Sequence, residues 1–144
     1  MRLQRIDHVG YAVEDLEEAV RYHERLYQAE VAHRERIESD GVDEALLAVG
    51  GSFIQLLAPT SEDSPVARFL ARNGPGIHHV GYGVADVAAT LEDLAEMGVR
   101  LVDQHPRRGS RGTTVAFLHP KGAMGVLVEL VQDHDATGPS TLPA

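Results

Sequence analysis

Four polar side chains stand at positions of the chain where apolar residues are expected. Gln55 and Glu129 each lie inside a run of apolar residues. His8 and His79 lie in two short runs that share the pattern His-Val-Gly-Tyr and are 71 positions apart. Burying an isolated carboxylate costs several kcal/mol or more unless it is paired or binds a metal. The four side chains are therefore candidate metal ligands.

The donor set indicates the kind of ion. Two imidazoles, an amide oxygen and a carboxylate suit a divalent ion of borderline hardness, such as Co²⁺, Ni²⁺, Mn²⁺ or Zn²⁺. The chain has no cysteine, which excludes disulfides, thiolate ligands and a cysteine nucleophile. Taken alone, Gln55 could be an edge-strand residue and Glu129 could pair with an arginine. The occurrence of one histidine at the same place in both halves favours the metal site.

The remaining histidines are predicted to have other roles. His78 is expected to face away from His79, because adjacent residues of a strand alternate between its two faces. We expect five further histidines not to be ligands: His23, His33, His105, His119 and His134.

The repeated run indicates two copies of one structural unit. A chain of 144 residues has the length of about one domain, and each half alone is too short to bury an ample core. We therefore expect one domain at residues 1–133 with a shared core, composed of module 1 at about 3–58, a linker at about 59–75 and module 2 at about 76–132. The composition, 43% hydrophobic and 24% charged, is typical of a folded globular protein.

The first half is predicted to be a βαβββ unit. β-Branched and aromatic residues predict a strand at 5–13. Asp15 is a predicted helix N-cap, followed by apolar residues at helical spacing up to Tyr27. Strands at 30–38, 44–49 and 52–58 follow, separated by turns at Asp40-Gly41 and Gly50-Gly51.

The second half repeats this plan after a connector. Ser64 and Pro65 predict a short helix in the connector, capped by the serine and with the proline at its first position. A strand at 77–84, a helix at 86–97 that Gly98 ends, and strands at 100–104, 113–118 and 125–132 follow. The polar segment 134–144 is predicted to be a disordered tail.

The charge distribution excludes some partners and suggests another. A net charge of −9 argues against a protein that holds nucleic acid by phosphate contacts. The N-terminus lacks a signal-peptide pattern and no run of about 18 apolar residues occurs, so we expect a cytoplasmic protein that does not bind membranes. The segment between Gln104 and Val128 contains no acidic residue, and it carries Arg107, Arg108, Arg111 and Lys121. It is either a solvated loop or a contact for a small polyanion.

The duplicated unit, the Ile-Asp-His opening and the single glutamate of the last strand resemble the vicinal oxygen chelate superfamily over residues 3–132. This resemblance implies an α+β fold in which two βαβββ modules form a cupped, incomplete β-barrel. It also implies metal ligands on one concave face and paired protomers, so we expect a homodimer.

Within this superfamily the chain resembles the methylmalonyl-CoA epimerase family. The motifs that carry the resemblance include Ile6-Asp7-His8-Val9-Gly10, Gly41-Val42-Asp43-Glu44-Ala45, Gly76-Ile77-His78-His79-Val80 and Arg107-Arg108-Gly109-Ser110-Arg111-Gly112. The resemblance implies that His8, Gln55, His79 and Glu129 bind the metal, Co²⁺ above all, and that Glu44 is an acid/base residue. The implied reaction interconverts (2R)- and (2S)-methylmalonyl-CoA by removal of the C2 proton through a metal-stabilised enolate.

An inversion of this kind needs proton transfer on both faces of C2, and Glu129 is the candidate for the second acid/base group. Contacts to the acyl-CoA substrate are expected from the acid-free segment, namely Arg107, Arg108, Ser110, Arg111 and Lys121.

Two other functions are compatible with the same residues. A glyoxalase-like lyase would act on a glutathione hemithioacetal with a comparable His, Gln and Glu set. A ligand-sequestering protein of the same fold would need no catalytic metal, although retention of all four ligand-type residues argues against it. An extradiol dioxygenase would use iron with two histidines and one glutamate, and it would leave Gln55 unexplained.

Overall fold

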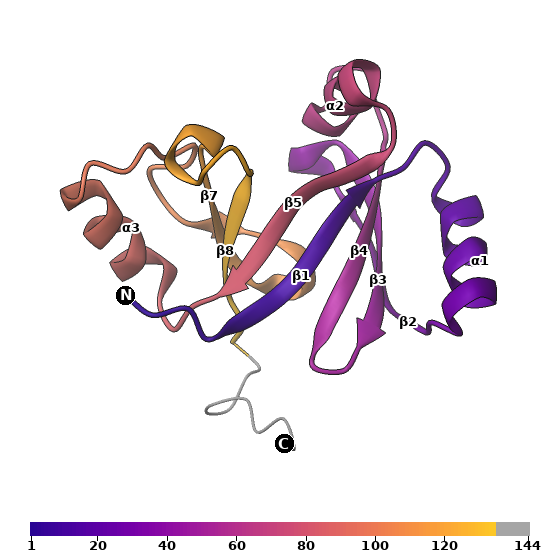
Figure 1. Ribbon diagram of the computed structural model, residues 1–144, viewed down its shortest axis with the longest axis horizontal. Helices are drawn as coiled ribbons and strands as arrows, with labels where there is room; N and C mark the ends of the chain where they lie inside the picture. Colours follow the sequence, from indigo (N-terminus) through magenta and orange to yellow (C-terminus); the bar gives the residue numbers. More distant parts are fainter. Residues whose placement is uncertain (135–144) are drawn as a thin grey trace. The chain divides into compact units, whose positions relative to one another are not determined.

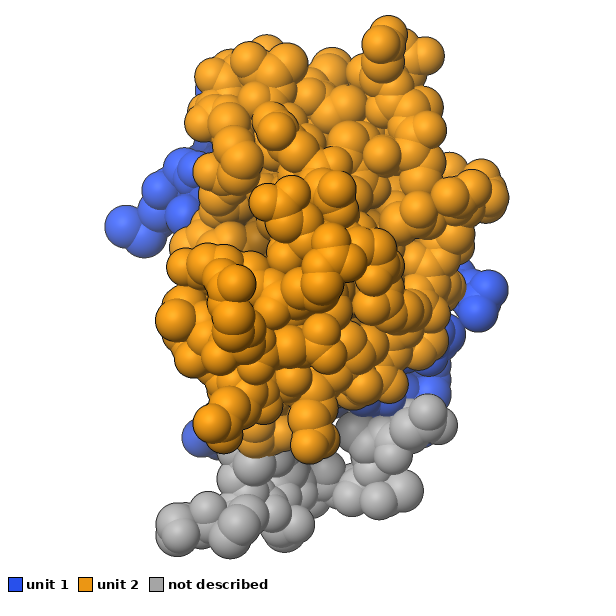
Figure 2. Space-filling view, turned by 90° about the vertical axis from the view of Figure 1, so that its right-hand side faces the viewer, with its two compact units in different colours: residues 1–7, 79–144 blue, residues 8–78 orange. Residues whose placement is uncertain are grey.

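The computed structural model describes residues 1–134, so the predicted tail lies outside the described residues from position 135 onward. The chain divides into two compact units, which Figure 2 colours separately. One unit comprises residues 8–78, and the other comprises residues 1–7 together with the chain from residue 79.

The unit of residues 8–78 is a four-stranded sheet with two helices. Its strand order is β2-β3-β4-β1, with β1 parallel to β4 and the other neighbours antiparallel. Figure 1 shows β3 and β4 as a long hairpin. The elements are β1 (Arg5–Ala12), α1 (Leu16–Tyr27), β2 (Val31–Ile37), η1 (Glu38–Asp40), β3 (Val42–Val49), β4 (Ser52–Pro59) and α2 (Pro65–Asn73).

Helix α1 covers one face of this sheet. Val20 of the helix packs against the buried Ala45, Leu47 and Leu56 of β3 and β4. Because side chains alternate along a strand, the residues between these, such as Leu46 and its register partner, project from the opposite face. On that second face Val42 and Leu57 pack against Val66 of α2, and the polar side chains of Glu44 and Gln55 share the face with them.

The second unit follows the same plan. Its strand order is β5-β8-β7-β6, with β5 parallel to β8. Helix α3 packs Leu91 and Leu94 against Ala116, Leu118 and Leu130 of β7 and β8. The elements are β5 (Gly76–Gly83), α3 (Val87–Glu96), β6 (Arg107–Arg108), η2 (Ser110–Gly112), β7 (Thr114–Leu118), η3 (Pro120–Gly122) and β8 (Val128–Gln132).

The two predicted helix caps, Asp15 and Ser64, are confirmed, and Asp86, expected as the first residue of its helix, is the N-cap of α3. The side chains of Asp15, Ser64 and Asp86 accept hydrogen bonds from the backbone N–H groups three residues later, at 3.0 Å in each case. Each cap satisfies one of the N–H groups that lack a partner in the first turn of a helix. None of these helices, in the part of the chain that the structure describes, is long and apolar enough to cross a membrane.

Two predicted strands of the second half are wrong: one does not form, and the other begins later than expected. Residues 100–104 form no strand and make only an isolated bridge between Leu101 and Leu118. The N–H groups of Val102 and Asp103 both donate to the carbonyl of Phe117, which breaks the regular ladder, and the short strand β6 occurs later. The last strand begins at Val128, because residues 123–126 form a turn in which the N–H groups of positions 125 and 126 donate to the carbonyls of positions 120 and 123.

The predicted fold class is confirmed at the level of its units. Both halves have the α+β composition of a βαβββ module, each with a parallel pair between its first and last strands.

Candidate active site

The four candidate ligands occupy equivalent register positions in the two units. In the first unit Gly10 of β1 is paired with Gln55 of β4, and in the second unit Gly81 of β5 is paired with Glu129 of β8. In each case a histidine lies two residues before the glycine, on the same face of the strand. Each unit therefore presents one imidazole and one oxygen donor in the same relation.

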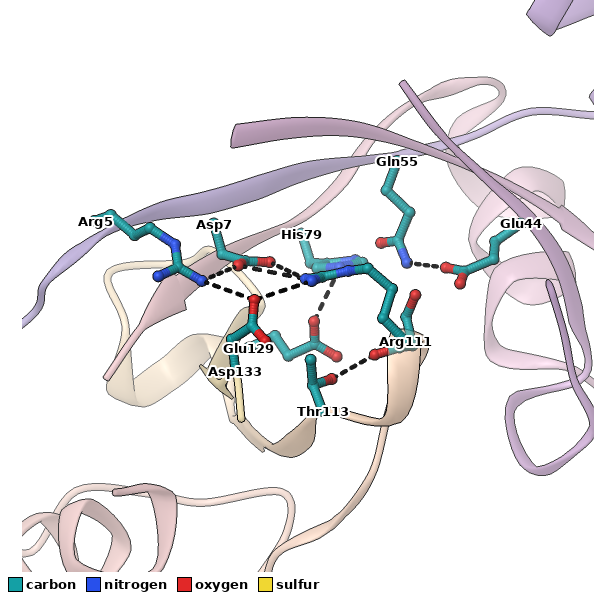
Figure 3. Close-up of polar contacts among 10 residues, drawn as sticks. Arg5, Asp7, Glu44, Gln55, His79, Arg111, Thr113, Glu129 and Asp133 are labelled. Atoms are coloured by element: carbon teal, nitrogen blue, oxygen red, sulfur yellow. Dashed lines mark hydrogen bonds and ion pairs between the residues drawn. The ribbon is translucent and has the colours of Figure 1, made fainter. Parts of the chain in front are cut away.

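Gln55 is held by a second buried side chain of its own unit. Its Nε2 atom donates a hydrogen bond to Oε2 of Glu44 at 2.5 Å, as Figure 3 shows. Both side chains are almost fully buried, with relative exposures of 5% for Gln55 and 1% for Glu44. The amide is consequently oriented with its nitrogen toward Glu44.

This orientation leaves the carbonyl oxygen of Gln55 for another partner. Within residues 1–134, Oε1 of Gln55 is buried and has no hydrogen-bond partner. A buried acceptor without a partner carries a desolvation cost of about 1–3 kcal/mol, so such atoms are uncommon in folded proteins. A divalent cation would satisfy this oxygen, and the donor set therefore fits a metal ion.

The second unit brings a nitrogen and an oxygen donor close together. Nε2 of His79 lies 3.8 Å from Oε1 of Glu129, as Figure 3 shows. That separation is too long for a hydrogen bond. Because metal bonds to nitrogen and oxygen are about 2.0–2.2 Å long, two atoms this far apart can bind one ion. The ring of Phe117 meets the His79 ring edge-on, with 5.5 Å between the centroids, and limits its orientation.

His78 points away from its neighbour, as predicted. Its ring lies against Phe69 of α2, with centroids 5.2 Å apart, whereas the ring of His79 lies against Phe117. Burial lowers the pKa of His78 below its usual range, although the nearby Asp40 opposes the shift. His78 is therefore a packed residue of the first unit.

The arginines of the acid-free segment differ in their surroundings. Nε of Arg107 lies 3.3 Å from Asp103, and the guanidinium sits 5.3 Å from the ring centre of Phe117. Arg111 pairs with Asp7 at 3.2 Å and with Asp133 at 3.3 Å. Arg108 and Lys121, by contrast, are exposed and form no ion pair with any residue from 1 to 134. These two cations are the accessible ones for an anionic ligand.

Ser110 contributes a backbone acceptor to the same segment. Its carbonyl accepts hydrogen bonds from the N–H of Thr113 at 3.0 Å and from the Thr113 hydroxyl at 2.6 Å. The following residue, Arg111, has a left-handed backbone with φ of 59°. A non-glycine residue in that region is strained, and such strain persists only where surrounding contacts maintain it.

Asp7 is a functional candidate that the sequence analysis did not identify. It is buried, with 1% exposure, and Nη2 of Arg5 lies 2.7 Å from its Oδ1 atom. Asp7, Arg5, Arg111 and Asp133 form a four-residue ionic network, drawn in Figure 3. The place of Asp7 next to His8 in the Ile-Asp-His motif was the available signal, since a buried carboxylate needs a partner.

Comparison with known proteins places the chain in a family. Residues 7–117 match the model of the Glyoxalase/Bleomycin resistance protein/Dioxygenase superfamily. The ethylmalonyl-CoA/methylmalonyl-CoA epimerase of Cereibacter sphaeroides is 40% identical over 130 residues, which cover 89% of this chain and 97% of that protein. The mitochondrial methylmalonyl-CoA epimerase of Homo sapiens is 37% identical over 131 residues, which cover 90% of this chain and 74% of that protein.

A solved structure agrees with these relatives. A variant of Streptomyces coelicolor methylmalonyl-CoA epimerase, bound to 2-nitronate-propionyl-CoA, matches with a TM-score of 0.92 and 46% identity over 96% of this chain and all of that chain. The chain therefore belongs to the Glyoxalase/Bleomycin resistance protein/Dioxygenase superfamily and, within it, to the methylmalonyl-CoA epimerases.

Proposed function

We propose that this protein interconverts (2R)- and (2S)-methylmalonyl-CoA by proton transfer at C2, with one divalent metal ion held by His8, Gln55, His79 and Glu129. The relatives support the reaction, since the curated and solved proteins named above are epimerases of this substrate class. The chain-specific support for the metal is the equivalent placement of one histidine and one oxygen donor in each unit.

The observation that carries the proposal is the buried carbonyl oxygen of Gln55. Glu44 accepts a hydrogen bond from the amide nitrogen and thereby determines which end of the amide remains for a ligand. A glutamine that served packing alone would be expected to use its oxygen in a hydrogen bond, as buried side-chain oxygens generally do. An oxygen donor held in this way is suited to a divalent cation.

The reaction requires stabilisation of negative charge and two proton transfers. Loss of the C2 proton leaves an enolate, because C2 lies between a thioester and a carboxylate. A bound divalent ion would stabilise the charge that develops on the thioester oxygen, an effect of several kcal/mol in the transition state. The chain's own residues must then remove a proton from one face of C2 and deliver one to the other.

Glu44 is the proposed acid/base group for one face. Its carboxylate is buried and fixed by the hydrogen bond from Gln55, so the position of its oxygens is limited before substrate binds. Glu129 is the proposed group for the other face, through the oxygen that it does not give to the metal. A metal-bound carboxylate is a weaker base than a free one, which favours Glu44 as the stronger of the two.

The remaining features of the proposal concern the metal, the substrate and the assembly. We propose Co²⁺ as the ion, with Ni²⁺, Mn²⁺ or Zn²⁺ as possible replacements. Arg108 and Lys121 are the proposed contacts for the CoA phosphates, and Arg107, Ser110 and Arg111 shape the segment that carries them. A homodimer and a location in the cytoplasm stay predictions from the sequence.

Deuterium incorporation at C2 tests the reaction. Chelator-treated protein would be incubated with (2S)-methylmalonyl-CoA in D₂O, with and without added Co²⁺, and both exchange and inversion would be followed by NMR. We expect exchange with inversion only when metal is present. Glu44→Gln should slow inversion by about 100-fold or more, since general acid/base groups contribute roughly that factor.

A matched variant controls for the loss of one carboxylate. Glu24 is exposed on α1, and Glu24→Gln should react like the wild type. Exchange no faster than the spontaneous reaction with every divalent metal would overturn the epimerase proposal. Activity on methylglyoxal and glutathione in that case would favour the glyoxalase-like lyase.

A further inference from the structure

The edge strand β2 carries two polar side chains beside the proposed acid/base residue. Glu35 of β2 is the direct cross-strand partner of Glu44 of β3. His33, two residues earlier, lies on the same face of β2. One ligand-type atom from each of His33, Glu35 and Glu44 lies within 4.8 Å of the other two. All of these residues belong to the unit of residues 8–78.

Two ionised carboxylates in this arrangement repel each other. Like charges directly opposite on neighbouring strands are destabilising, and the effect grows as water is excluded. The side chain of Glu35 is 24% exposed, and Glu44 is 1% exposed. The pair therefore requires donors that hold the two carboxylates in separate positions.

A donor holds each carboxylate. Nε2 of His33 lies 2.9 Å from Oε1 of Glu35, a hydrogen bond in which the imidazole N–H donates. The amide nitrogen of Gln55 donates to Oε2 of Glu44. His33 on the edge strand is thus linked through Glu35 and Glu44 to Gln55. The carbonyl oxygen of Gln55 is the proposed metal ligand.

We propose that His33 is a positioning residue for Glu44. By holding the Glu35 carboxylate, His33 keeps it from displacing Glu44, and Glu44 retains the geometry in which Gln55 is oriented. This inference rests on the proposed function, because it assigns His33 a role in placing the acid/base group of the epimerase. His33 does not touch the substrate and acts only through Glu35 and Glu44.

Four forms of the metal-saturated, full-length protein test the inference: the wild type, His33→Leu, Glu35→Leu and the double variant. We expect His33→Leu to lower kcat for epimerisation about 10-fold with KM changed less than about twofold, because the loss affects placement of the acid/base group and not binding. The double variant should recover most of this loss, since removal of Glu35 removes the carboxylate that His33 restrains.

Two further variants separate positioning from general damage to β2. Arg34 lies between the two residues on the other face of the strand, where it pairs with Glu17, so Arg34→Leu should leave kcat unchanged. His33→Gln keeps an N–H donor at a similar distance and should retain most of the wild-type kcat.

The outcomes distinguish the inference from the proposed function. An active wild type with an unchanged kcat in His33→Leu would overturn the inference alone, as would a double variant no better than His33→Leu. A wild type without epimerase activity would overturn the proposed function and this inference with it.

Discussion

At the scale of single residues, the site depends on how hydrogen-bond donors and acceptors are distributed. Gln55 gives its donor to Glu44 and keeps its acceptor for another partner. Arg111, which the sequence predicts as a substrate contact, donates to Asp7 and Asp133. Local sequence shows the type of each side chain, whereas its partners determine what it can bind.

The metal affinity of a Gln55 variant tests the first of these residues. Gln55→Leu removes the oxygen donor, and we expect the affinity for Co²⁺, measured by isothermal titration calorimetry, to fall at least about 10-fold. Gln104 is exposed, so Gln104→Leu is the matched control and should bind as the wild type does. Equal affinities for the two variants would exclude Gln55 as a ligand.

The stability of an Arg111 variant tests the ionic network. The side chain of Arg111 is 19% exposed and that of Asp7 only 1%, so Arg111→Leu leaves a buried carboxylate with fewer partners. Because Arg5 still contacts Asp7, we expect a loss of about 2 kcal/mol in the free energy of unfolding in urea.

Arg108 serves as the comparison for this loss. It is exposed and lies outside the network, so Arg108→Leu should change the free energy of unfolding by less than about 0.5 kcal/mol. If the two arginine variants unfolded at the same urea concentration, the ionic network would make no contribution to the stability of the fold.

At the scale of elements, the turn before β3 places Glu44. Gly41 has a left-handed backbone with φ of 64°, and it follows η1 directly before the strand. A Cβ atom at Gly41 would lie 2.8 Å from Cβ of Ser64, the residue that caps α2. This turn therefore joins the start of the strand that carries Glu44 to the start of a helix.

Both the left-handed backbone of Gly41 and its closeness to Ser64 should make substitution by alanine destabilising. We expect Gly41→Ala to destabilise the protein by about 2–3 kcal/mol, since the left-handed conformation disfavours a side chain and the contact with Ser64 is too short. Gly50 also has a left-handed backbone, with φ of 56°, but a Cβ atom there would meet nothing within 4 Å. Gly50→Ala should therefore lower the free energy of unfolding by only about 1 kcal/mol. Thermal unfolding of the two variants and the wild type measures both losses.

A comparison of the two glycine variants isolates the steric contribution. A Gly41→Ala protein that is as stable as Gly50→Ala would show that Ser64 and α2 move away without cost, and that the turn does not couple the two elements.

At the scale of the whole molecule, the proposed ligands come from both halves of the sequence. His8 and Gln55 belong to the first unit, and His79 and Glu129 belong to the second. A metal that binds only the folded protein stabilises it in proportion to the logarithm of metal concentration. The proposed ion should therefore contribute to the stability of the complete chain as well as to its chemistry.

Thermal unfolding with and without metal tests this expectation. At free Co²⁺ of about 100 times the dissociation constant, we expect the folded state to gain about 2.7 kcal/mol and the melting temperature to rise accordingly. Excess chelator should reverse the rise, and His8→Ala should abolish it. A melting temperature that does not respond to any divalent metal would contradict the proposed metal site.

Several local features follow from the sequence because short-range physics controls them. The caps at Asp15 and Ser64 were predicted, since a side-chain oxygen meets N–H groups only three residues away. The errors at 100–104 and 125–127 arose where long-range pairing competes with local propensity. Val102 and Asp103 have strand-like neighbours, yet both of their N–H groups go to one carbonyl of β7.

The sequence by itself determined the duplicated βαβββ plan and the ligand-type residues, because repeats, residue types and spacing are properties of the chain alone, and its resemblance to the epimerase family implied Glu44 as an acid/base candidate. Only the tertiary structure decided that Glu44 accepts a hydrogen bond from the Gln55 amide and that Arg111 pairs with Asp7. It also decided that Glu35 lies opposite Glu44, with His33 bonded to Glu35. These contacts depend on strand register and on burial, which join residues that are distant in sequence and determine which donor each buried acceptor receives.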